Sequence, residues 1–133
     1  MMRYLMDVAG AGLVLIPLLF FMVVCGLLEG MVIYLFRIRR YPVAIGHALV
    51  VNIVSLLAGY LLWPLISRIG LDLGSKRLQL PTLAFLWLLT VLIEAPVLKL
   101  LNRAQAWERV FMASIVMNFL SYLIFYFMMT YRG

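Results

Sequence analysis

Four long apolar segments dominate this sequence. They cover residues 8–36, 42–66, 81–101 and 109–131, to within a few residues at each end. About 20 helical residues, rising 1.5 Å each, cross the roughly 30 Å hydrocarbon core of a bilayer. Only helices and closed barrels satisfy every backbone polar group in lipid, and the alternating pattern of barrel strands is absent from these segments. The sequence therefore predicts an all-α integral membrane protein with four transmembrane helices.

The composition supports lipid as the main solvent of the chain. Hydrophobic residues make up 67% of the 133 residues and charged residues only 12%, whereas a soluble domain is about 45–50% apolar and about 25% charged. The net charge is +6, and the basic residues flank the apolar segments, as is typical at an anionic membrane surface. We expect the lipid bilayer as a partner and no nucleic acid.

Short basic linkers, residues 37–42 and 102–109, predict that the four helices form two tight hairpins. A longer linker, residues 67–80, contains two glycines and joins one hairpin to the other. We expect a single membrane domain over residues 1–133. Its parts are the first hairpin at about 8–66, the linker at 67–80 and the second hairpin at about 81–131.

An internal repeat relates the two hairpins. EGMVIYLFR, from Glu29, aligns with EAPVLKLLN, from Glu94, and NIVSLLAGY, from Asn52, aligns with NFLSYLIFY, from Asn118. A single insertion in the longer linker brings both alignments into register. Polar residues are rare in membrane helices, so the shared E…N-x-x-S pattern is more specific than shared apolar letters. Two hairpins in tandem have the same membrane orientation, and the sequence thus predicts a parallel repeat about an axis along the membrane normal.

Localisation follows from the first apolar segment and from the basic residues. That segment is longer than the apolar region of a signal peptide and lacks a small-residue cleavage site, which predicts an uncleaved first helix. The hairpin-linker side carries one more Lys or Arg than the other side. By the positive-inside rule, this small excess favours cytoplasmic hairpin loops and both termini outside. We expect a bacterial cytoplasmic (inner) membrane.

Each hairpin carries one glutamate and one asparagine at similar depth from its linker. Glu29 and Asn52 lie on the first pair of helices, and Glu94 and Asn118 lie on the second pair. Both residues of a pair sit about 12–15 Å from the linker, counting 1.5 Å per residue. We therefore expect the two side chains of each pair to meet. A carboxyl group in hydrocarbon is favoured in its neutral form, in which it donates as well as accepts hydrogen bonds.

Two roles for these pairs remain open. In the first, Glu, Asn and the following serine (Ser55 or Ser121) hold the helices of each hairpin together. In the second, the glutamates bind a proton, a cation or a polar part of a substrate. The motif occurs once in each hairpin, which favours the structural role, because a residue pattern that stabilises a hairpin is expected in both.

The basic cluster of Arg37, Arg39 and Arg40 has two interpretations as well. Contact with lipid headgroups is the simpler one, and docking to an acidic subunit is the rival. The sequence contains no motif of a hydrolase, metalloprotease or nucleotide-binding loop, and its single histidine lacks a second metal ligand at suitable spacing. We expect no enzyme activity, cofactor or metal.

These patterns favour a structural or accessory subunit of a larger membrane assembly, with other membrane subunits or further copies of the chain as partners. The alternative is a small oligomeric transporter linked to protons or ions through Glu29 and Glu94.

Overall fold

The computed structural model describes residues 2–68 and 80–130, with side chains for 19–66, 68 and 80–128. Helices are the only regular secondary structure among these residues. The elements are α1 (Met2–Leu35), α2 (Tyr41–Arg68), α3 (Leu80–Leu101) and α4 (Trp107–Thr130). The predicted all-α class is thus confirmed. Helix α1 begins about six residues earlier than predicted. Most of the predicted linker lies outside the described residues. Lys76, Arg77 and Arg132, which the predicted orientation places on the side opposite the hairpin loops, also lie outside them.

Within the described residues, three helices are long and apolar enough to cross a membrane. Their apolar spans are Tyr41–Ile66 in α2, Leu80–Leu101 in α3 and Trp107–Met128 in α4. In α1, the segment with described side chains, Leu19–Leu35, is also apolar but shorter. These spans are those expected of an integral membrane protein.

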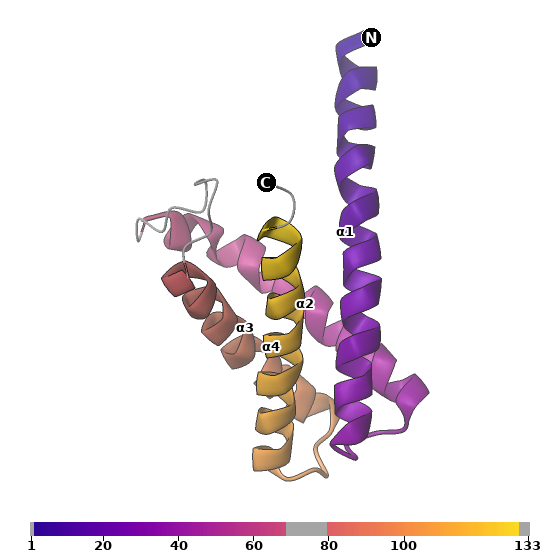
Figure 1. The fold of residues 1–133 in the computed structure, drawn as a ribbon, viewed down its shortest axis with the longest axis vertical. Helices are drawn as coiled ribbons and strands as arrows, with labels where there is room; N and C mark the ends of the chain where they lie inside the picture. The colour runs from indigo at the N-terminus through magenta and orange to yellow at the C-terminus, as the bar shows by residue number, and fades with distance from the viewer. Residues whose placement is uncertain (1, 69–79, 131–133) are drawn as a thin grey trace.

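The helices form a bundle whose two hairpin loops lie at the same end, the lower end in Figure 1. Helix α1 packs against α2, and α3 packs against α4, as the short linkers predicted. The hairpins meet through α1 with α4 and through α2 with α3. Away from the loops, α2 and α3 lean to one side, so the bundle opens toward its upper end (Figure 1).

The apolar core lies between the glutamates and the loops. Ile33, Leu98 and Met117 are its largest fully buried members, and Ala44, Ala48 and Ala113 keep α2 and α4 close to their neighbours. All of its buried residues on α1 and α3 follow Glu29 and Glu94, and those on α2 and α4 precede Asn52 and Asn118. Among the described side chains, the connected apolar core therefore fills the loop end of the bundle.

Helix α1 ends in a Schellman motif centred on Arg37. The Ile38 amide donates to the Ile33 carbonyl (3.1 Å) and the Arg37 amide donates to the Tyr34 carbonyl (2.8 Å). Arg37 has a φ of 55°, the left-handed conformation that this motif requires. Ile33 and Ile38 both belong to the apolar core. The motif thus turns the chain sharply toward α2.

Two glycines bring α1 and α2 into close contact. A Cβ atom on Gly30 would lie 2.9 Å from the Ile45 Cα atom, and one on Gly26 would lie 2.7 Å from a Leu49 methyl group. Glycines four residues apart lie on one helix face and let two helix backbones approach each other. This contact sets the spacing of the first hairpin.

Candidate functional site

Both predicted glutamate–asparagine pairs are in contact. The Asn52 Nδ2 atom donates a hydrogen bond to Glu29 Oε2, and Asn118 Nδ2 donates to Glu94 Oε2 at 2.7 Å. Both glutamates are 1% exposed. Each bond connects the two helices of one hairpin, at the level where the apolar core ends.

The serines differ from the prediction, because each contacts the glutamate of the other hairpin. Ser121 Oγ, on α4, donates to Glu29 Oε1 at 2.6 Å. Ser55, on α2, forms a hydrogen bond with Glu94 of α3. The sequence interpretation placed each serine within its own hairpin. A residue three positions after an asparagine is turned by about 60° around the helix, and this rotation directs it toward the neighbouring hairpin.

Together, these six side chains form a polar layer across the bundle. Glu29 accepts one hydrogen bond on each carboxyl oxygen, from Asn52 and from Ser121. Asn118 also donates to the Ser114 carbonyl (3.0 Å). The predicted residues are therefore brought together in one cluster instead of two separate pairs. We refer to Glu29, Asn52, Ser55, Glu94, Asn118 and Ser121 as the polar layer.

A cavity of about 750 Å³ begins at the polar layer and extends away from the hairpin loops. All four helices contribute to it, and its lining includes all six residues of the polar layer. Its walls are largely apolar and aromatic. Wall residues include Phe21, Leu56, Trp63, Leu86 and Phe125. Thr90 and Tyr122 add a hydroxyl pair 2.9 Å apart on the wall between α3 and α4.

A second polar cluster, around Asn102, connects the hairpin loops. Asn102 is fully buried. Its Oδ1 atom accepts from Arg39 Nε (2.8 Å), and its Nδ2 atom donates to the Leu98 carbonyl (2.9 Å) and to His47 Nδ1 (3.1 Å). Gln105 donates to the Ile38 carbonyl at 3.3 Å. The Asn102 cluster therefore links the first loop to the second across the base of the bundle.

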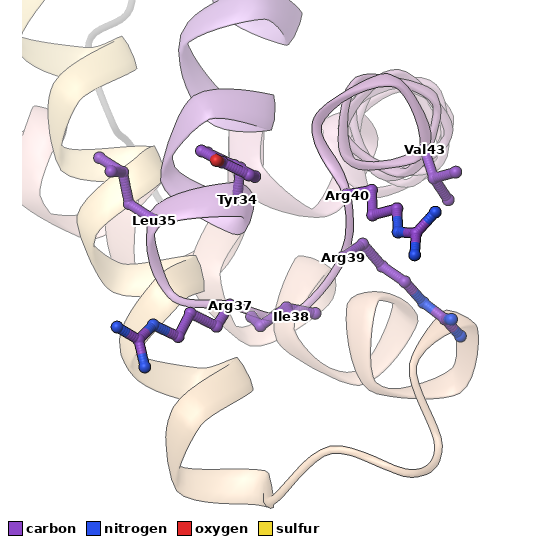
Figure 2. Close-up of a pocket in the computed structure, with 7 residues that line it drawn as sticks. All are labelled: Tyr34, Leu35, Arg37, Ile38, Arg39, Arg40 and Val43. Atoms are coloured by element: carbon purple, nitrogen blue, oxygen red, sulfur yellow. The ribbon is translucent and has the colours of Figure 1, made fainter.

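A shallow basic hollow of about 720 Å³ lies beside the first loop. Figure 2 shows that Arg39 and Arg40 extend to one side of this loop, near Val43, whereas Arg37 extends to the opposite side. Its lining residues are Tyr34, Leu35, Arg37, Ile38, Arg39, Arg40 and Val43. The three predicted arginines thus share one hollow, but Arg39 also has a structural contact, to Asn102.

Sequence reasoning missed the Asn102 cluster and the close-contact glycines. Asn102 stands in a polar linker, where an exposed side chain is the usual expectation, and nothing local marks it as buried. The spacing of Gly26 and Gly30 was a usable signal, because it matches the small-xxx-small pattern of membrane helix contacts.

No group of three or more His, Cys, Asp or Glu side chains is placed to hold a metal ion within the described part of the chain. The chain matches no known protein-family model, and comparisons with curated proteins and with solved structures also return no match.

Proposed function

We propose that this protein is a structural or accessory subunit of a larger membrane assembly, without a catalytic site of its own. In this proposal all four helices span a bacterial cytoplasmic membrane, with the hairpin loops on the cytoplasmic side. The two hairpins are parallel repeats of one unit.

The main observation behind this proposal is that the Glu29 carboxyl group is hydrogen-bonded to both hairpins. Both of its oxygens accept hydrogen bonds, one from Asn52 in its own hairpin and one from Ser121 in the other. A buried carboxyl group occupied in this way stabilises the bundle, since interhelical hydrogen bonds in membranes contribute roughly 0.6–2 kcal/mol each. Such an arrangement favours a structural role for the polar layer.

The bonding pattern also supports the parallel repeat. In both hairpins the glutamate pairs with the asparagine of its own hairpin and with the serine of the other. A two-fold axis along the membrane normal would place the contacts of Glu29 onto those of Glu94. The same axis would place the contact between α1 and α4 onto the contact between α3 and α2.

Copurification tests the subunit proposal. The intact protein, extracted from its native membrane in mild detergent, is expected to carry a membrane partner in fixed stoichiometry.

The charge-reversing variants Arg37→Glu and Arg40→Glu test the two interpretations of the basic hollow, lipid headgroups and an acidic subunit. Loss of the partner would indicate an acidic subunit at the hollow, and retention would favour lipid headgroups there. A protein that purifies only as copies of itself contradicts the subunit proposal.

A transporter linked to protons or ions is the second candidate, and the cavity is the observation that favours it. The cavity ends on Glu29 and Glu94, and an intramembrane acid beside a cavity is the usual arrangement of an ion or proton path. Cysteine placed at position 29 or 94 would react with a water-soluble maleimide if the cavity carries water. Failure of both positions to react would exclude this candidate.

A further inference from the structure

We propose that the cavity above the polar layer binds a single-chain amphiphile with a primary ammonium head, which contacts Glu29 and Glu94. This inference goes beyond the subunit proposal, which holds whether or not the cavity has a ligand. If the protein is a transporter, the second candidate function, this amphiphile would be its class of substrate.

The size and lining of the cavity are those of a ligand site. Small-molecule pockets enclose about 300–1,000 Å³ and combine apolar walls with a few convergent polar groups. This cavity has a volume of about 750 Å³ and places its carboxyl groups at one end. On α1 it extends from Glu29 to Phe21, which corresponds to about 12 Å along the helix. That length suits an extended alkyl chain.

The hydrogen-bonding groups at the polar-layer end of the cavity determine which head group would bind there. Each donor side chain of the polar layer bonds a carboxyl group: Asn52 and Ser121 bond Glu29, and Asn118 and Ser55 bond Glu94. The capacity left over is mostly that of acceptors, since each carboxyl oxygen has a second lone pair and each amide has a carbonyl oxygen. A primary ammonium group offers three donors and a positive charge. Its positive charge also favours the ionised form of the carboxyl groups, which burial alone disfavours. It therefore complements this end better than a hydroxyl group or a carboxylate head does.

Gly59 offers a way to block the cavity without disturbing the packing. It lines the cavity on α2, and a Cβ atom added there would meet no atom within 4 Å. Gly46, on the same helix, is equally free of neighbours but is not among the residues that line the cavity. The same substitution at these two positions therefore separates filling of the cavity from a general effect on α2.

The experiment measures binding of dodecylamine, dodecanol and dodecanoate to the full chain in lipid nanodiscs, with native mass spectrometry to count bound molecules. We expect one dodecylamine per chain and an affinity about tenfold or more above that for dodecanol. The Gly59→Leu variant should lose this binding, and the Gly46→Leu variant should retain it. The isosteric Glu94→Gln variant should lose the preference for dodecylamine over dodecanol. Size-exclusion chromatography would show that each variant remains folded.

Three results would overturn the proposal. They are equal binding of dodecanol or dodecanoate, unchanged binding in Gly59→Leu, and an unchanged preference for dodecylamine in Glu94→Gln. None of these results affects copurification with a membrane partner, so failure here is distinguishable from failure of the subunit proposal.

Discussion

Arg37 occupies the helix-terminal position at which glycine is the most common residue. Its φ of 55° is required by the two hydrogen bonds that close the end of α1. A side chain with a Cβ atom is strained in this conformation by about 1–2 kcal/mol. The protein keeps an arginine here in spite of this strain, and the side chain contributes to the basic hollow.

Replacement of Arg37 by glycine should therefore stabilise the fold. We expect the free energy of unfolding to rise by about 0.5–1 kcal/mol, because removal of the strain outweighs the extra freedom of glycine in the unfolded chain. Denaturant titration in detergent micelles would measure this change. The control is Arg37→Ala, which removes the charge but retains the Cβ atom, and it should give no gain. Equal gains from both variants would show that charge repulsion, not strain, was relieved.

Asn102 shows how one buried amide can fix two loops. Its carbonyl oxygen and both N–H groups have partners, in Arg39, Leu98 and His47. Asn102→Ala should lower the free energy of unfolding by about 1–3 kcal/mol, since it removes all three bonds and leaves buried groups unpaired. Arg39→Ala removes only one of them and should cost less. Equal losses in the two variants would contradict the assignment of Asn102 as the centre of the cluster.

At the scale of helices, the contact between α1 and α2 is set by backbone proximity. A Cβ atom on Gly30 would stand 2.9 Å from a backbone atom of Ile45, and backbone moves far less readily than the end of a side chain. On Gly26 the nearest atom belongs to the Leu49 side chain, which can rotate away. Gly30 is thus the stricter of the two positions.

Gly30→Ala should push α1 away from α2 and lower the free energy of unfolding by about 1–3 kcal/mol, as overpacking of a close contact does. Gly46→Ala, with no atom within 4 Å of the new Cβ, should be neutral or slightly stabilising, because alanine is the better helix former. Thermal unfolding in detergent would compare the two variants. A tolerated Gly30→Ala would mean that the helices are not held this closely.

At the scale of the whole molecule, the polar layer divides the bundle into two parts. On the loop side, the apolar core and the Asn102 cluster fill the space between the helices. On the other side, the same four helices line the cavity. The layer is also where the hairpins are joined, because Ser121 of one binds Glu29 of the other.

Loss of the Glu29 carboxyl group should therefore weaken contacts within and between hairpins together. Glu29→Leu removes the acceptor of both Asn52 and Ser121, and we expect a loss of about 1–3 kcal/mol for each donor left unpaired. Glu29→Gln keeps one acceptor and one donor in nearly the same shape and should cost much less. Unfolding in mixed micelles would measure both variants. Similar losses would argue that the shape of the side chain, and not its hydrogen bonds, holds the hairpins.

Much of the architecture could be predicted from local properties of the chain. The apolar segments predicted the number of helices and, except for the start of α1, their bounds to within about two residues, because span length and backbone hydrogen bonding in lipid allow few alternatives. The depth of Glu29 and Asn52, counted from a short linker, predicted their contact, because a tight hairpin leaves little freedom in register. Glu94 and Asn118 followed by the same reasoning.

The remaining features depend on how the two hairpins are rotated and inclined relative to each other. That rotation brings Ser121 to Glu29, and no spacing within one hairpin specifies it. The inclination of α2 and α3 opens the cavity (Figure 1). The contact between the two hairpins, through Arg39 and His47, buries Asn102 although each loop looks exposed in sequence. The helices, the hairpins and the depth of the acids can be read from the sequence alone, since they depend on hydrophobicity and on distance along the chain. The serine partners of the glutamates and the position of the cavity become visible in the folded bundle, because they depend on contacts between segments far apart in the chain.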